Sequence, residues 1–133
     1  RLRQSKAMAN IKTFEDLIVW KKAHELVLLT YKITADFPKH ELFGLVSQMR
    51  RAAASVAANI VEGFRRKTLK DSLNFYNTSD ASLEELKYHA LLSFDLNYIK
   101  QEVYIQLKNK CNEVGGSLTN WIQSQTKYLP PKP

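Results

Sequence analysis

The sequence predicts an all-α fold, an antiparallel up-and-down four-helix bundle, as the single domain of a 133-residue chain. Four long segments place apolar residues at steps of three and four, which is typical of amphipathic helices, and no segment shows the alternation of a strand. The connections between these segments are short, so consecutive helices are expected to pack side by side in opposite directions. No segment holds a run of about 18 apolar residues, so no transmembrane helix is expected.

The first helix is predicted from about Glu15 to Asp36. Thr13 can cap its N-terminus, and the acidic residues that follow favour the positive end of the helix dipole. Its apolar residues cover more than one stripe, which predicts more than one packing neighbour, and one of these neighbours can belong to another subunit. Pro38 ends the segment because proline disfavours helical geometry in the residue before it.

The alanine-rich stretch from Leu45 to Lys67 is the segment around which the rest of the chain is organised. Alanine favours helix because it loses no side-chain entropy on folding, and small side chains let neighbouring helices approach closely. Polar residues lie on or beside the small-residue face, and buried polar groups need hydrogen-bond partners. We therefore predict a structural network formed by Ser55, Asn59, Glu62, Gly63 and Glu85, in which Asn59 holds partners across the seam to a neighbouring helix.

The third and fourth helices follow after short turns. The third is predicted from about Leu69 to Leu96, behind a capping box that begins at Thr68. The fourth is predicted from about Lys100 to Lys127, where apolar residues alternate as in the seam of a helix bundle. Between them, Asn97 suits a left-handed helix cap. The glycine pair at 115–116 indicates either close helix packing or a local kink.

The predicted bundle spans residues 13–127 and leaves two flanking segments. Residues 1–12 form a basic arm that we expect to be disordered or left over from cloning, and they lack the apolar core of a secretory signal. Residues 128–133 form a proline-rich tail that cannot extend the last helix. The single cysteine, Cys111, excludes an internal disulfide bond and fits a reducing cytoplasm.

No residue set in the sequence indicates catalysis, so we predict that the protein is not an enzyme. His24, His40 and His89 lack partners at metal-ligand spacing, and there is no glycine-rich phosphate loop. Neither a metal nor another cofactor is therefore expected. Cys111 falls on the apolar seam, where it is read as a small core residue rather than a nucleophile. The two glutamates at 84–85 predict a structural ion-pair network with arginines of the second helix rather than an acid–base site.

The charge of the chain gives the first indication of function. The net charge is +7 and the pI is about 9.5, and a basic domain attracts polyanions such as nucleic acid. The positive charge gathers in residues 1–12 and 39–67, which each carry a net charge of +4. We predict an oligomeric nucleic-acid-binding protein, with RNA as the expected ligand, whose cations contact phosphates with little sequence specificity. The candidate residues are Arg65, Arg66, Lys67 and Lys70, and also Arg50 and Arg51, although Arg51 can instead be held inside the bundle near Ser55.

An alternative interpretation is a protein-interaction scaffold whose basic face binds an acidic partner protein. Salt-sensitive binding to unrelated RNAs would favour the first interpretation, and binding to one protein alone would favour the second. Membrane binding is not expected, because no segment is long and apolar enough to insert.

Four residue patterns follow one another along the chain. They are Phe14-x-x-Leu17-x-x-Trp20-Lys21-x-Ala23, Phe37-Pro38-x-x-Glu41-x-Phe43-Gly44-Leu45-x-x-Gln48-x-x-Arg51-Ala52, Ser55-x-x-x-Asn59-Ile60-x-Glu62-Gly63 and Ser82-x-x-Glu85. From about Phe14 to Trp121, this arrangement resembles the four-helix-bundle proteins encoded in intervening sequences of bacterial 23S ribosomal RNA genes.

The resemblance implies a homopentameric barrel of bundles with a basic surface. The same family includes the accessory variability proteins of diversity-generating retroelements, whose barrel binds nucleic acid and a reverse transcriptase. It therefore makes a reverse transcriptase the natural example of an acidic protein partner. Two positions depart from the family pattern. Ala57 stands where proline is usual, which predicts a straighter helix, and Asn97 stands where glycine is usual, which a left-handed cap tolerates.

Overall fold

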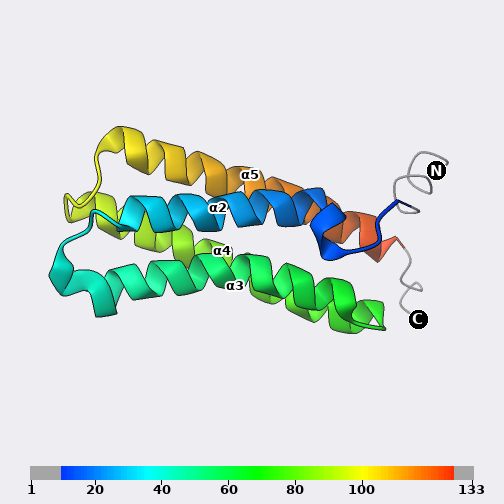
Figure 1. Cartoon of the computed structure of the whole chain (residues 1–133). Helices are drawn as coiled ribbons and strands as arrows, with labels where there is room; N and C mark the ends of the chain where they lie inside the picture. The colour runs from blue at the N-terminus through cyan, green and yellow to red at the C-terminus, as the bar shows by residue number, and fades with distance from the viewer. Residues whose placement is uncertain (1–9, 128–133) are drawn as a thin grey trace.

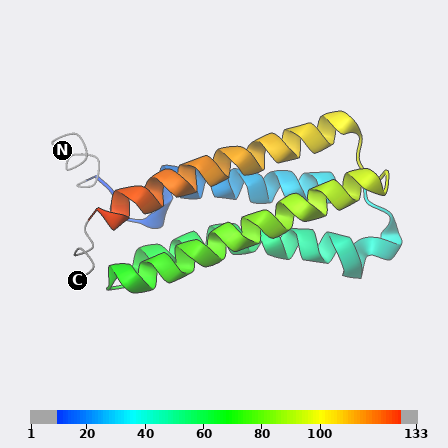
Figure 2. The same cartoon turned by 180° about the vertical axis from the view of Figure 1, so that it is seen from behind.

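The computed structural model describes residues 10–127 and confirms the predicted antiparallel four-helix bundle. Figure 1 shows the four long helices running in alternate directions, and Figure 2 shows the same bundle from behind, with α4 and α5 toward the viewer. Residues 1–9 of the basic arm and the whole proline-rich tail lie outside the described residues. The long helices are α2 (Ile18–Thr34), α3 (Ser47–Arg65), α4 (Leu69–Asp95) and α5 (Gln101–Thr126).

Each long helix packs against the next one in the chain, and α5 returns to lie beside α2. Each contributes apolar side chains to one core, and the removal of these side chains from water is the main term that stabilises such a bundle. Within residues 10–127, no helix has the length and apolar character needed to cross a bilayer. The large aliphatic side chains that are fully buried are Leu17, Leu26, Met49, Ile60, Leu83, Leu86, Leu107 and Leu118.

The first helix begins later than its sequence predicts. The residues Phe14–Asp16 form a separate 3-10 turn, η1, and the chain is extended at Leu17 before α2 begins at Ile18. The Asp16 carboxylate accepts hydrogen bonds from the backbone N–H groups of Lys12 and Thr13, at 2.9 and 3.0 Å, which lower its pKa. These hydrogen bonds accompany the end of η1 at Asp16. The extended backbone at Leu17 then places the Leu17 side chain in the core.

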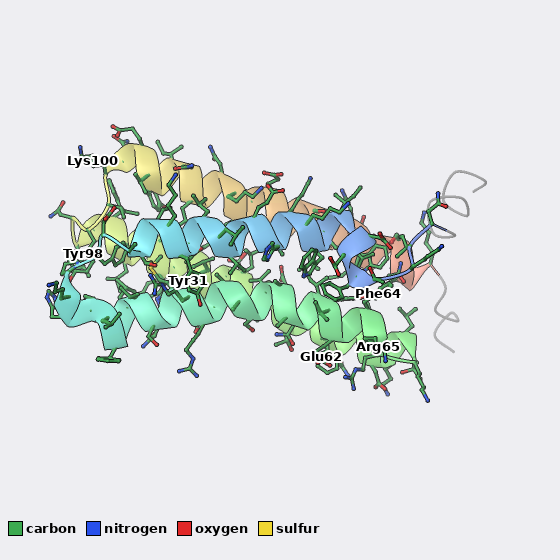
Figure 3. The ribbon with its side chains drawn as sticks, viewed as in Figure 1. Tyr31, Glu62, Phe64, Arg65, Tyr98 and Lys100 are labelled. Atoms are coloured by element: carbon green, nitrogen blue, oxygen red, sulfur yellow. The ribbon has the colours of Figure 1, made fainter. Side chains whose placement is uncertain are left out.

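The connection from α2 to α3 is more structured than the short loop predicted from the sequence. It contains η2 (Lys39–Glu41) and the wider turn η3 (Leu42–Val46), so α3 begins at Ser47. The Tyr98 hydroxyl donates to Glu41 across 2.8 Å and is the main reason why the pKa of Glu41 is lowered. This bond ties the α2–α3 connection to the α4–α5 turn, which lies at the same end of the bundle (Figure 3). In that turn Asn97 adopts the predicted left-handed conformation, with φ 61°.

The glycine pair at 115–116 does not break α5, which runs unbroken from Gln101 to Thr126. A Cβ atom added at Gly115 would lie 3.3 Å from the Leu83 Cδ2 atom, so this glycine permits a close approach between α5 and α4. A Cβ atom at Gly116 would meet nothing within 4 Å. Of the two interpretations of the pair, close packing is therefore correct, and it applies to Gly115.

Gly116→Ala is expected to raise the free energy of unfolding by about 0.5–1 kcal/mol. Alanine is the better helix former by this amount, and the added methyl group enters open space. Urea denaturation followed by circular dichroism measures the change. Gly115→Ala is the control, since its methyl group presses on Leu83 and should give a smaller gain. A destabilised Gly116→Ala variant would contradict the regular helix at this position.

Candidate nucleic-acid interface

The predicted basic cluster lies at one corner of the bundle, where α3 ends and α4 begins. We call this region the α3–α4 corner and define it by Arg65, Arg66, Lys67 and Lys70, all of which are exposed. Helix α3 ends at Arg65 because Arg66 is extended, and the Thr68 hydroxyl then caps α4 by accepting from the Asp71 N–H across 3.2 Å. This tight turn displays the four cations together. Figure 3 shows Arg65 and Glu62 on the outer side of α3, near its end.

Arg66 differs from the other three cations because it has partners within the protein. Its guanidinium pairs with the Glu62 carboxylate one turn earlier and lies 4.7 Å from the centre of the Phe75 ring. Within residues 10–127, Arg65, Lys67 and Lys70 form no ion pair. A solvated cation without a protein partner is free to replace the counterions of a phosphate chain. The corner therefore offers three uncommitted positive charges and one anchored charge.

Arg50 and Arg51, the second predicted pair of arginines, have different surroundings in the structure. The Arg50 Nε atom donates to Thr34 Oγ1 across 3.0 Å, and the guanidinium lies 4.6 Å from the centre of the Tyr31 ring. Arg50 thus joins α3 to α2, and Figure 3 places Tyr31 between these helices. Arg51 is exposed and lines a shallow hollow, so the alternative in which it is held inside the bundle is not realised. The internal role belongs to Arg50, and we remove it from the candidate phosphate contacts.

The predicted polar network forms a direct bridge between α3 and α4. The Ser55 and Ser82 hydroxyls lie 2.8 Å apart across the seam. The Asn59 side chain donates to the backbone carbonyl and hydroxyl of Ser55, at 2.8 and 3.0 Å, so it acts within α3. The expectation that Asn59 itself reaches across the seam is therefore wrong, because Ser55 does so. The buried Ser79, which no sequence pattern singles out, adds a second bridge, because its hydroxyl donates to the Val56 carbonyl across 2.7 Å.

The ion pair predicted between Glu85 and an arginine of α3 is not formed among the described residues. The Glu85 side chain is exposed and lines a shallow hollow with Arg51, Ser55 and Ser82, but no salt bridge to it exists among the described residues. The hollow does bring Glu85 to the same part of the α3–α4 surface as Arg51. The predicted proximity of these two residues is therefore correct, whereas the predicted ion pair is not formed.

Gly63 has a specific packing role beside the α3–α4 corner. A Cβ atom at this position would lie 2.4 Å from Cε1 and 2.7 Å from Cδ1 of the Tyr76 ring. Real side chains essentially never approach so closely, so only glycine leaves room for the tyrosine. Tyr76 is 2% exposed and packs edge-on against Trp121, with ring centroids 6.4 Å apart.

Tyr76 and Trp121 line a cleft of about 300 Å³ beside the cations, which we call the corner cleft. Burial raises the pKa of the Tyr76 hydroxyl, and the nearby Trp121 N–H offsets part of this effect. The buried Trp121 Nε1 atom has no hydrogen-bond partner among the described residues. The cleft is also lined by apolar and polar side chains and by two of the corner cations. These lining residues are Phe64, Leu69, Ser72, Gln125, Arg66 and Lys67.

The residues considered for catalysis or metal binding are separated in the structure. In the described part of the chain, no group of three or more His, Cys, Asp and Glu side chains is placed to hold a metal ion. Cys111 is buried in the core, and burial raises its pKa to about 12. Its thiol therefore stays protonated at neutral pH, where the thiolate would be needed for nucleophilic attack.

The fold and the surface together define a class: a small, basic, all-α bundle whose uncommitted cations gather at one corner. A family model described as 23S rRNA-intervening sequence protein matches residues 15–120, and the chain belongs to that family. Among solved structures, the chain is similar to a protein with unknown function from the S23 ribosomal protein family of Bacteroides thetaiotaomicron VPI-5482. The two are 25% identical with a TM-score of 0.72, and the match covers 80% of this chain and 99% of that chain. A comparison with curated proteins finds no match.

Proposed function

We propose that this protein is a non-enzymatic nucleic-acid-binding protein that prefers RNA and holds the phosphate backbone at the α3–α4 corner. The observation that carries the proposal is the set of exposed cations there, three of which have no ion-pair partner within residues 10–127. Phosphate contacts of this kind supply affinity without reading sequence, because every nucleotide presents the same charge.

The arrangement of the corner supports this proposal in two ways. First, the positive end of the α4 dipole lies at Leu69, between the cations, and adds to the attraction for anions. Second, Arg66 is held by Glu62 and Phe75, which lowers the entropy lost when its guanidinium meets a phosphate. The remaining cations stay mobile in water and can follow an irregular backbone. Such a surface suits folded or single-stranded RNA.

Equilibrium binding at low salt tests the proposal. Fluorescence anisotropy of a labelled structured RNA, a single-stranded RNA and a duplex DNA should give the tightest binding to one of the RNAs. Competition with heparin should release the RNA, since both ligands occupy the same cations. Absence of binding to all three nucleic acids would contradict the proposal, and the cations would then be sought as the site of an acidic protein partner.

We also propose that the chain forms a homo-oligomer, a pentamer by the family resemblance, through the end of the bundle opposite the α3–α4 corner. Phe43 is 93% exposed there, and Leu42 and Tyr31 beside it are each about half exposed. These side chains line one hollow together with Arg50 and Arg51. A cluster of exposed large apolar side chains is a common mark of a protein contact surface.

Phe43→Ser is expected to shift the protein from oligomer to monomer. The wild-type chain should elute as an oligomer in size-exclusion chromatography with light scattering, and the variant should show a much lower mass at the same concentration. Ile18→Ser is the control, because Ile18 is 67% exposed at the other end of the bundle, where α2 begins, and does not line this hollow. A monomeric wild-type chain, or an oligomer unchanged by Phe43→Ser, would contradict the proposal.

A further inference from the structure

We infer that the corner cleft holds one unpaired base of a bound RNA strand while the neighbouring phosphates lie on the cations of the α3–α4 corner. This inference rests on the proposed function and adds a second kind of contact to it. The cleft measures about 300 Å³, which is the lower end of the range for sites that bind small molecules. It therefore suits a ligand of the size of a single base.

One polar group of the cleft lacks a partner. The Trp121 indole N–H is buried there and has no hydrogen-bond partner in the described part of the chain. The Tyr76 side chain lines the same cleft, so its hydroxyl is a second polar group within reach of a ligand. Buried polar groups in folded proteins are nearly always satisfied. The edge of a nucleobase carries both acceptors and donors, so it can bond to the two groups at once.

The shape of the cleft agrees with this ligand. Its lining includes the edge-to-face pair of Tyr76 and Trp121 and the apolar side chains of Phe64 and Leu69. Unstacked bases are commonly held against aromatic side chains, which accept the face of any base. Ser72 and Gln125 supply further polar atoms at the wall.

The position of the cleft links base and phosphate contacts. Arg66 and Lys67 also line the cleft, so a nucleotide whose base enters it has its phosphate next to these cations. In a duplex the bases are stacked and paired, and extruding one costs a few kcal/mol. The cleft therefore predicts tighter binding to RNA with unpaired nucleotides than to duplex RNA, a difference that the cations alone would not produce.

Trp121 itself is the reporter that tests the inference. In a Trp20→Phe background, Trp121 is the only tryptophan of the chain. A single-stranded RNA of about eight nucleotides, within the site size of common single-strand binders, should quench its fluorescence. A duplex RNA of the same length should leave the fluorescence unchanged. Equal quenching by inorganic phosphate at matched ionic strength would show that the cleft takes phosphate alone, and this would overturn the inference.

Tyr76→Phe tests the hydrogen bond separately. The variant keeps the ring that packs on Gly63 and removes only the hydroxyl, so it should fold with unchanged helicity. Its affinity for single-stranded RNA should fall about three- to tenfold, the range for one lost hydrogen bond, while duplex binding stays the same. Trp121→Phe, which removes the indole N–H, is the second variant and should show the same selective loss.

The two proposals fail in different ways. If single-stranded RNA binds with strong salt dependence but neither variant weakens it and Trp121 fluorescence does not change, the cleft inference is overturned and the phosphate site remains. If no RNA binds to the wild-type chain at low salt, the proposed function fails and the cleft inference fails with it.

Discussion

Replacing Arg65, Lys67 and Lys70 together by glutamine is expected to weaken RNA binding about a hundredfold at roughly 0.1 M salt. Each phosphate contact to a single strand contributes about 0.7 to the slope of log K against log salt. Three lost contacts therefore remove about two units of slope, which corresponds to about two orders of magnitude at this salt concentration. Anisotropy titrations of wild type and variant measure the difference, and circular dichroism should show unchanged helicity because the three side chains are exposed.

The matched control carries the same change of net charge elsewhere on the bundle. Lys32, Lys100 and Lys108 are exposed lysines toward the other end of the bundle from the α3–α4 corner, and none forms an ion pair within the described residues. Their triple replacement by glutamine should weaken RNA binding only a fewfold. Equal losses in the two variants would mean that RNA responds to the overall charge of the protein rather than to the corner.

Gly63→Ala is expected to lower the free energy of unfolding by about 1–3 kcal/mol, the usual cost of overpacking a core. The direction is informative because alanine is the better helix former by about 1 kcal/mol. The loss arises from the new methyl group, which would lie 2.4 Å from the ring of the fully buried Tyr76. Urea denaturation measures it, and Gly116→Ala in α5 should change stability in the opposite direction.

A double-mutant cycle identifies the cause of this loss. Tyr76→Leu replaces the ring by a smaller side chain, so Gly63→Ala should cost much less in that background than in the wild type. Contacting residues commonly show coupling energies of 0.5–3 kcal/mol, which makes the difference measurable. If Gly63→Ala costs the same in both backgrounds, the contact with Tyr76 is not the reason for glycine at this position.

The sequence predicts the bundle well because each helix carries its own periodic signal. The seam residues Leu107, Cys111, Val114 and Leu118 are all buried, as their spacing indicates. The α3–α4 corner is also visible in the sequence, since three of its four cations are consecutive and the fourth follows one turn later. Features that depend only on local order along the chain are therefore the ones that could be predicted.

Features that depend on the rotation of one helix against another could not be predicted. The contact of Arg50 with Thr34 and Tyr31 joins residues that are far apart in sequence, and nothing in the local pattern distinguishes Arg50 from Arg51. The corner cleft likewise needs Trp121 of α5 beside Tyr76 of α4. One signal was present: Gly63 interrupts an alanine-rich helix where alanine would favour the helix, which indicates that a neighbour fills the space.

The local break at Leu17 was missed for a different reason. Thr13 and the acids after it are typical of a helix start, and they do form a helical turn. That turn is short because Asp16 bonds back to the backbone before it, and burial of Leu17 then favours an extended residue over a continued helix. Capping signals locate the start of helical structure but not whether the first turn is continuous with the next.

The salt dependence of RNA binding tests the central claim most directly. Affinity for a labelled single-stranded RNA is measured from about 50 to 300 mM salt for the wild-type chain and for the variant that lacks the Arg65, Lys67 and Lys70 charges. The phosphate site predicts a linear fall of log K with log salt. The slope should be about −2 or steeper for the wild type, and shallower by about two units for the variant. Binding that is independent of salt, or equal slopes for the two proteins, would contradict the assignment of phosphate binding to the α3–α4 corner.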